Sequence, residues 1–298
     1  MKILVAGAQG QLARALVGAA RARDGVDVVA LGRPRLDLLD KAAIAEAFAA
    51  IQPDLVVNAA AYTAVDKAES DAGAAFAVNR DGAVALAAAA DRHACPIIHV
   101  STDYVFDGAK GEPYVETDPV NPASVYGRSK LEGEIAVRAA NPRHLILRTA
   151  WLYAPYGQNF LRTMVRLARE QPQLRVVGDQ RGNPTYVPHL ADAILAIAAQ
   201  LGAGGRAADA WGVYHAAADG ETTWAGFAAE IVRVGTQHGI PAVPVSPIAT
   251  AEYPTPAVRP ANSRLDCSRL VRVFGAKLPP WQQGVSECVA RLARENLL

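Results

Sequence analysis

The sequence predicts an α/β fold, a doubly wound parallel sheet followed by a smaller C-terminal lobe. Two observations predict it. Short β-rich apolar runs alternate with Ala-rich helix formers through the first half of the chain, which is typical of parallel strands covered by helices on both faces. The first apolar run also leads directly into a glycine turn and a helical segment. The expected strands are residues 3–6, 26–31, 55–59, 97–101 and 145–148.

Helix formers fill the segments between these strands, and they are long enough for right-handed crossovers. The expected helices are residues 11–23, 40–51, 79–93 and 124–139, and later 223–234 and 281–295. We place a first domain at 1–150 and a second at 151–298, with about 186–202 returning to the first. Residues 241–260 contain six prolines and are predicted to be an irregular surface segment.

Bulk composition excludes several classes of protein. A formal charge of +1 with no basic run argues against a nucleic-acid partner. The apolar stretches are too short to cross a bilayer, and the first residues resemble a strand rather than a secretory signal, so we expect a cytoplasmic protein without a membrane role. Cys95, Cys267 and Cys288 lie far apart, which predicts neither a zinc site nor a disulfide framework.

The glycine turn indicates a dinucleotide. Gly7, Gly10 and Ala13 give the spacing G-x-x-G-x-x-A between a strand and a helix. Small residues let the backbone approach a pyrophosphate, which the helix N-terminus attracts, while Ala13 suits helix–strand packing. An ordinary glycine turn is the alternative. The predicted cofactor contacts in this turn are Gly7, Gln9, Gly10, Gln11 and Leu12.

The second strand ends in arginines instead of the acidic residue that selects NAD. Arg33 and Arg35 could pair with a 2′-phosphate, which favours NADPH over NADH, although both could simply solvate a loop. Asp37 and Leu38 follow and could reach the adenine. Small side chains after the third strand suit the nicotinamide ribose, or else packing alone. The expected cofactor contacts continue with Ala60, Ala61 and Tyr62 in this segment and, further along the chain, with Tyr126 and Lys130.

A Y-x-x-x-K pair indicates proton transfer. Tyr126 and Lys130 are about one helical turn apart, so both lie on one face. A neighbouring lysine cation favours the phenolate, which predicts a lowered tyrosine pKa and a better general acid. An exposed surface pair is the alternative. Upstream, Thr102 leaves a strand at its carboxyl end, where ligands of such sheets bind, and its hydroxyl could polarise a carbonyl.

These motifs stand in the order seen in the extended short-chain dehydrogenases/reductases, and the chain resembles that family. More narrowly, residues 58–67, 101–106, 148–151, 179–185 and 259–260 resemble the dTDP-4-dehydrorhamnose reductases. The resemblance implies a Rossmann-type fold with a substrate-binding C-terminal lobe and a catalytic set of Thr102, Tyr126 and Lys130. It also implies reduction of the C4 keto group of dTDP-4-dehydro-6-deoxy-L-mannose to dTDP-L-rhamnose, the last step of dTDP-rhamnose biosynthesis.

The resemblance also implies which residues contact the nucleotide sugar. An indole such as Trp151 can stack on an apolar sugar face, although a core position is the alternative. A guanidinium such as Arg259 can bind a diphosphate, with a surface salt bridge as the alternative. The implied substrate contacts are Thr63, Val65, Thr102, Asp103, Tyr104, Trp151, Thr185 and Arg259.

Some features depart from relatives or leave alternatives open. Tyr104 stands where related dehydratases have glutamate, which removes an acid that helps eliminate water; Ala13 and Ala150 replace a commoner glycine and serine. Some family members use Mg²⁺ at a subunit contact, but no acidic cluster maps to such a site, and a homodimer is left open. A non-catalytic NADP-binding subunit, like that of methionine adenosyltransferase, and a reductase or epimerase of another nucleotide sugar are the competing functions.

Overall fold

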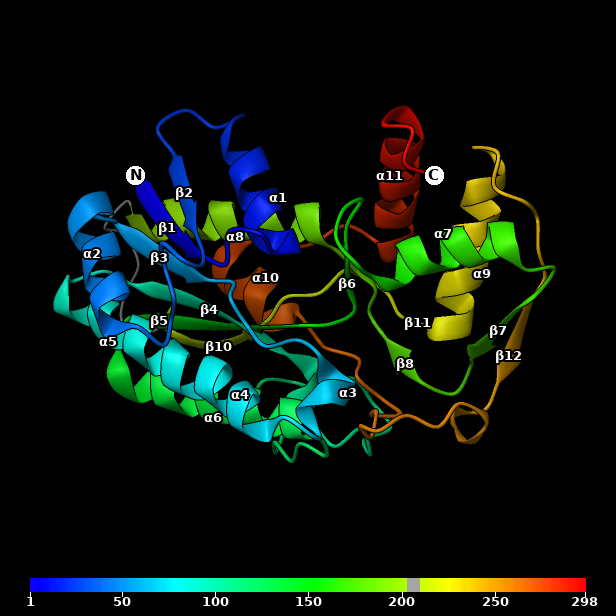
Figure 1. The fold of residues 1–298 in the computed structure, drawn as a ribbon, viewed down its shortest axis with the longest axis horizontal. Coiled ribbons are helices and arrows are strands. Elements are labelled where there is room, and N and C mark those ends of the chain that lie inside the picture. Colours follow the sequence, from blue (N-terminus) through cyan, green and yellow to red (C-terminus); the bar gives the residue numbers. More distant parts are fainter. Residues whose placement is uncertain (203–209) are drawn as a thin grey trace.

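The computed structural model describes residues 1–202 and 210–298 and contains the predicted parallel sheet (Figure 1). Six strands pair in the order β10-β5-β4-β3-β1-β2. The order reverses between β1 and β3, which is where doubly wound folds bind their ligands. The strands are β1 (Lys2–Ala6), β2 (Asp27–Leu31), β3 (Leu55–Asn58), β4 (Ile97–Thr102), β5 (His144–Thr149) and β10 (Gly212–His215).

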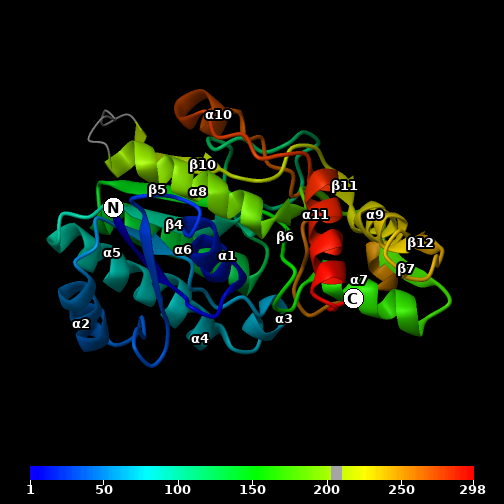
Figure 2. The same cartoon turned by 90° about the horizontal axis from the view of Figure 1, so that it is seen from above.

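Helices cover both faces of the sheet because successive side chains of a strand point to opposite sides. Ile3 and Val5 of β1 face one apolar cluster, whereas Leu4 and Ala6 face another. Figure 2 shows α8 on one side of the sheet and α2 and α5 on the other. The first cluster contains α1 (Gln11–Ala20), α8 (Val187–Gly202) and α10 (Ser268–Phe274); the second contains α2 (Lys41–Ile51), α5 (Ala83–Arg92) and α6 (Val125–Ala140).

One predicted helix is not uniform. Residues 79–93 were expected to form a single α-helix, but Ala77–Gly82 is a π-helical turn that leads into α5. The wider turn carries Asn79, whose buried side chain bonds to the backbone of Tyr62 and to Ser129. The partners of Asn79 lie in other segments of the chain, so helix propensity could not predict these bonds. Turns of the π type are frequent at functional sites.

The second lobe has its own apolar cluster, in which Tyr153, Phe227 and Trp281 are central. Its helices lie at the right of Figure 1. They are α7 (Phe160–Glu170), α9 (Trp224–Thr236) and α11 (Trp281–Arg294), beside the parallel pair β7 (Leu174–Val177) and β12 (Val245–Ile248).

The prediction of an irregular segment at 241–260 was partly wrong, because β12 and a 3₁₀ turn at Thr250–Glu252 lie within it. Pro247 is part of β12. In a two-stranded ribbon each strand has one unpaired edge, where a missing N–H costs little, so proline is tolerated.

The chain crosses between the lobes more than once. The segment expected to return, about 186–202, is α8, which packs against α1 of the first lobe. β10 joins the same sheet beside β5, and α10 shares the apolar cluster of α8. We therefore propose a first lobe that comprises residues 1–150 together with α8, β10 and α10. None of the described helices is long and apolar enough to cross a membrane.

Candidate active site

The glycine turn lies at the point where the strand order reverses. Gly7 has φ +109° and bonds to Leu31 of β2, and the Gly10 N–H donates to the Gly7 carbonyl at 2.9 Å. A Cβ at Gly7 would lie 3.0 Å from the backbone nitrogen of Ala60, so only glycine fits here. The turn leaves Gly10 as the extended N-cap of α1, which suits an anion at this helix end.

The other predicted contacts in the turn differ in exposure. Gln9 is exposed, whereas the side chain of Leu12 is buried in the core, so only its backbone could face a cofactor. The Gln11 amide oxygen accepts a hydrogen bond from the Asn159 side chain at 3.0 Å. This bond links the glycine turn to the second lobe.

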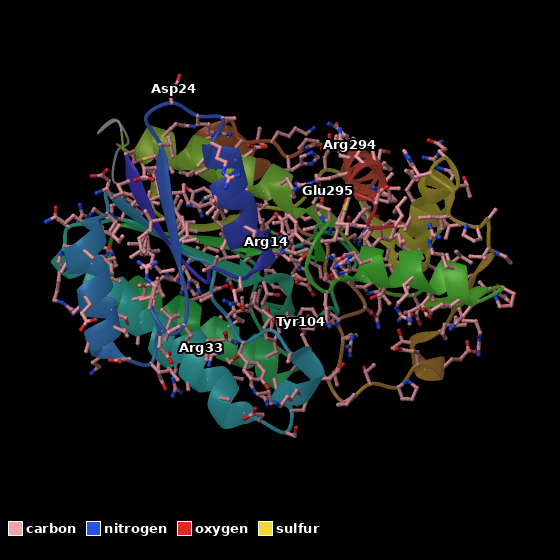
Figure 3. All side chains as sticks on the ribbon, turned by 45° about the horizontal axis from the view of Figure 1, so that its top comes forward. Arg14, Asp24, Arg33, Tyr104, Arg294 and Glu295 are labelled. Atoms are coloured by element: carbon pink, nitrogen blue, oxygen red, sulfur yellow. The ribbon has the colours of Figure 1, made fainter. Side chains whose placement is uncertain are left out.

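Two cations stand beyond the end of β2. Arg33 and Arg35 are exposed, and neither has an ion-pair partner in the described part of the chain. Figure 3 shows Arg33 beside the sheet and Tyr104 nearer the middle of the molecule. Of the two residues that follow, the Asp37 carboxylate accepts from the Leu39 N–H at 3.0 Å, and the Leu38 side chain packs in the core. The arginines are therefore available to an anion, and the Leu38 side chain is not open to an adenine.

The loop after β3 is held by Asn79. The Asn79 amide oxygen accepts from the Tyr62 N–H at 2.8 Å, and its nitrogen donates to the Tyr62 carbonyl and to Ser129 of α6. Ala60 and Ala61 precede Tyr62 in this loop and are half-buried. The sequence gave Asn79 no role beyond the start of an expected helix; the structure shows that it fixes this loop.

Thr63 and Val65 follow in the same segment. Thr63 is exposed, and Val65 is half-buried at the start of the short helix α3 (Val65–Ala68). Within the described residues the Thr63 side chain makes no hydrogen bond, which leaves its hydroxyl open to a ligand.

Thr102 and Asp103 end β4 on the carboxyl side of the sheet. The Thr102 hydroxyl caps the 3₁₀ turn Asp103–Val105, accepting from the Tyr104 N–H and donating to the Asp103 carboxylate at 2.9 Å. Asp103 is buried, its Oδ2 has no partner among the described residues, and burial raises its pKa to about 6. A buried orphan oxygen is unusual in a native structure and is a feature of ligand sites.

Tyr126 and Lys130 lie on α6, which the Ser124 hydroxyl caps through the Gly127 N–H. The Tyr126 ring meets the Tyr104 ring edge to face at 5.6 Å. Burial raises the pKa of the Tyr126 phenol to about 12, although a bond with Thr102 opposes that shift. The Thr102 and Tyr126 hydroxyls therefore lie within reach of each other at the carboxyl end of β4.

The predicted effect of Lys130 on the phenol was wrong for this structure. Burial lowers the pKa of Lys130 to about 8, and its Nζ donates to the Val100 carbonyl at 2.7 Å. Burial raises the pKa of Tyr126, and the charge of Asp103 adds to that shift. The ammonium is directed toward β4, a contact that helical spacing alone does not reveal.

Trp151 lies between the lobes and is held by protein side chains. Its backbone φ of +47° is uncommon for a large residue. Its indole stacks on Trp224 with centroids 3.5 Å apart and donates to Ser263 at 3.1 Å. Trp224 covers one ring face, so the predicted stack of that face on a sugar would require Trp224 to move.

Thr185 does not reach a cleft. The residue is 0% exposed, and its hydroxyl donates to the Asn183 carbonyl and accepts from the Ala218 N–H. The Thr185 hydroxyl therefore joins two segments of the second lobe, and the implied contact of Thr185 with the substrate stays a prediction.

Arg259 forms a fork-like ion pair with Asp66 of α3. The two guanidinium nitrogens lie 2.8 and 3.0 Å from the two carboxylate oxygens, and the charge lowers the pKa of Asp66. The electrostatic influence of Arg259 also reaches Tyr104. Arg259 thus lies beside the predicted sugar site, and a diphosphate would compete with Asp66 for its donors.

A buried ion pair supports the site from behind. Glu134 lies one turn beyond Lys130 and binds Arg148 of β5 through two nitrogens, at 3.0 and 2.8 Å. Ser101, the residue before Thr102, donates to the same carboxylate. The sequence did not identify this pair, because its partners meet only across α6, β4 and β5.

A metal centre has no obvious ligands. In residues 1–202 and 210–298 no group of three or more His, Cys, Asp or Glu side chains is placed to hold an ion. The His189–Glu287 pair, at 2.8 Å, is an isolated contact between α8 and α11. The Mg²⁺ site of some family members is therefore not assigned to residues of this chain.

Comparison with known proteins agrees with this geometry. The family model described as the RmlD substrate binding domain matches residues 1–294. A curated dTDP-4-dehydrorhamnose reductase from Sinorhizobium fredii is 49% identical over 296 residues, covering 99% of each chain. A crystal structure of a dTDP-4-dehydrorhamnose reductase from Clostridium acetobutylicum has TM-score 0.90 and 38% identity, covering 98% of this chain and 99% of the other.

A second solved structure, the dTDP-4-dehydrorhamnose reductase from Bacillus anthracis in complex with NADP, has TM-score 0.86 and 31% identity. It covers 97% of this chain and 99% of that one. The matches extend over both lobes, so they include the glycine turn, the Tyr126–Lys130 pair and the C-terminal segment with Arg259. The predicted resemblance is confirmed: the chain belongs to the dTDP-4-dehydrorhamnose reductase family.

Proposed function

We propose that this protein is an NADPH-dependent reductase that converts dTDP-4-dehydro-6-deoxy-L-mannose to dTDP-L-rhamnose. One observation carries the proposal: Thr102 and Tyr126 meet at the carboxyl end of β4, with Lys130 buried one turn behind. This arrangement offers two hydroxyl groups to a carbonyl oxygen, as a ketone reductase requires. Family membership then supports the C4 keto group of a dTDP-sugar as the acceptor.

The residues present fit NADPH. The Gly7–Gly10 turn and the start of α1 would hold the pyrophosphate, since a Cβ at Gly7 would fill the space beside Ala60. Arg33 and Arg35 would bind the 2′-phosphate, and the loop fixed by Asn79 would lie beside the nicotinamide ribose. Bound NADPH supplies the hydride that reduces C4.

The protein's own residues handle the oxygen and its proton. Thr102 would turn its hydroxyl proton from the Asp103 carboxylate to the C4 carbonyl oxygen and polarise it, and Tyr126 would give its phenolic proton to that oxygen as the negative charge develops. Asp103 and Tyr104 orient the sugar from the adjoining turn, and Arg259 binds the diphosphate. The proton and the hydride together convert the ketone to the secondary alcohol.

A non-catalytic binding protein would not need these groups at one place, so their convergence favours an enzyme. Three free cysteines in the described chain also suit a reducing compartment, and we propose that the protein acts in the cytoplasm. A stable complex with a large enzyme partner, formed without any turnover, would instead support the regulatory function.

The direct experiment follows NADPH absorbance while enzymatically prepared dTDP-4-dehydro-6-deoxy-L-mannose is supplied, and identifies the product by mass spectrometry and NMR. We expect NADPH oxidation with dTDP-L-rhamnose as the product. Oxidation with a UDP- or GDP-linked 4-keto sugar and none with the dTDP-sugar would reassign the substrate.

Replacement of both arginines after β2 tests the cofactor preference. In Arg33→Ala/Arg35→Ala, we expect the KM for NADPH to rise roughly 10- to 100-fold, since charge-assisted hydrogen bonds to the 2′-phosphate contribute about 1.5–3 kcal/mol. The KM for NADH should stay the same, because NADH lacks that phosphate. Steady-state kinetics with both cofactors measure this.

The control for the arginine variant is Arg169→Ala, which removes an exposed arginine from α7 of the second lobe. It should leave both KM values unchanged. Equal increases for NADPH and NADH in the double variant would mean that the arginines support the fold of the loop and not the phosphate.

A further inference from the structure

Two buried polar residues lie behind Lys130 and have no role in the reaction described so far. Asn58 ends β3, His99 lies in β4, and Lys130 comes from α6. The exposed fractions of Asn58, His99 and Lys130 are 1%, 1% and 2%. Asn58 and His99 lie 3.0 Å apart through Nδ2 and Nδ1, and His99 Nε2 lies 3.5 Å from Lys130 Nζ. Buried polar groups of this kind persist when they are paired.

The hydrogen bonds of this row have a fixed direction. The Ala60 N–H donates to Asn58 Oδ1 at 3.2 Å, which assigns the oxygen of the Asn58 amide. The Asn58 nitrogen must then donate to His99 Nδ1. Because a neutral imidazole has one donor nitrogen and one acceptor nitrogen, the His99 proton is on Nε2. The ring is neutral, since burial and the charge of Lys130 hold the pKa of His99 well below its usual range.

The direction of these hydrogen bonds decides whether the neutral or the charged form of the Lys130 amine is favoured. The His99 Nε2–H faces Lys130 Nζ, which also donates to the Val100 carbonyl. An N–H aimed at nitrogen stabilises the lone pair of a neutral amine and opposes an ammonium. Glu134, one turn further along α6, acts in the other direction and raises the pKa of Lys130. The titratable groups that act on the amine are His99 of β4 and Glu134 of α6, and Glu134 is itself paired with Arg148 of β5.

We infer that Asn58 and His99 are positioning residues that set the protonation state of Lys130 through a one-way chain of hydrogen-bond donors. The chain runs from the Ala60 N–H through both side chains and ends at the lysine nitrogen. Burial lowers the pKa of Lys130 to about 8, and the chain of donors acts in the same direction. The place of this titration in catalysis rests on the proposed function; the chain itself does not.

In the proposed reaction Lys130 would serve as a cation near the reacting groups, so its titration would set the alkaline limb of the pH profile.

The variant Asn58→Asp reverses the chain while keeping its first contact. A carboxylate still accepts from the Ala60 N–H, but it also accepts from His99 Nδ1, so the imidazole proton moves from Nε2 to Nδ1. His99 Nε2 then accepts from Lys130, and the pKa of Lys130 rises. We expect an upward shift of about one unit or more, since a hydrogen bond to the charged form favours that form.

Two NMR measurements on the protein without substrate report this directly. Side-chain ¹⁵N spectra give the tautomer of His99, and a pH titration of labelled lysine gives the pKa of Lys130. The pH profile of kcat/KM follows in the second stage, where the alkaline limb of Asn58→Asp should move to higher pH. A role in packing alone would change stability without moving either the tautomer or the limb.

Two further variants separate these effects. Asn141→Asp changes another fully buried asparagine, which bonds to the Cys95 carbonyl far from Lys130 along α6, and it should destabilise the fold without shifting the lysine titration. His99→Gln keeps an acceptor for Asn58 and a donor for Lys130, so it should keep the wild-type titration of Lys130. This second variant preserves the test if Asn58→Asp does not fold.

The results that would contradict the donor chain differ from those that would contradict the proposed function. An Nδ1–H tautomer in the wild type, or an unchanged Lys130 titration in folded Asn58→Asp, overturns the donor chain. A shifted titration in a protein that does not reduce the dTDP-sugar leaves the chain standing and removes the proposed substrate.

Discussion

Tyr126→Phe should bind NADPH as the wild type does and lose most of its turnover. The substitution removes one hydroxyl and keeps the ring that meets Tyr104 edge to face, so the site keeps its shape. A positioned general acid contributes about 10²–10⁴-fold to the rate, and we expect kcat to fall within that range. Cofactor titration by fluorescence and steady-state kinetics with the 4-keto sugar give the two numbers.

The matched control is Tyr114→Phe. Tyr126 is partly buried and Tyr114 is buried, at 3% exposure, and the Tyr114 hydroxyl donates to Asp107 outside the proposed site. Loss of that hydroxyl should cost stability and leave kcat unchanged. A wild-type kcat in Tyr126→Phe would refute the assignment of the general acid, and equal losses in both variants would point to a general effect of removing a buried hydroxyl.

Glu134→Gln should cause the largest loss of stability. Glu134 and Arg148 have side chains that are 2% and 5% exposed, and their charges neutralise each other inside the first lobe. The variant keeps the shape of the side chain but leaves the Arg148 cation buried without its counter-charge. Breaking a buried pair in this way costs about 3–5 kcal/mol, which urea unfolding would measure as a lower free energy of unfolding.

An exposed pair provides the comparison for Glu134. Arg166 and Glu170 are 60% and 51% exposed on α7, so Glu170→Gln should cost no more than about 1 kcal/mol. Enzyme activity provides a second measurement. Ser101 donates to Glu134 and precedes Thr102, so loss of the Glu134–Arg148 ion pair should also lower kcat. If the two variants were equally stable, the buried pair would contribute no more than a surface contact.

The sequence by itself determined the features that depend on neighbours in the chain. Strand runs, helix formers and the Gly7–Gly10 turn are local patterns, and the parallel sheet follows from them. Helical spacing placed Tyr126 and Lys130 on one face of α6, and the strand end placed Thr102 at the carboxyl edge of the sheet. Family motifs extended this to the identity of the reaction.

The tertiary structure decided where these groups point and what surrounds them. Lys130 contacts Val100, 30 residues earlier, and Arg259 pairs with Asp66, 193 residues earlier, so neither contact has a local signature. Burial raises the pKa of Tyr126 where spacing had predicted a fall, and it encloses the Thr185 side chain between two segments of the second lobe. Desolvation and long-range pairing depend on the whole packed molecule, whereas periodicity records only one turn or one strand at a time.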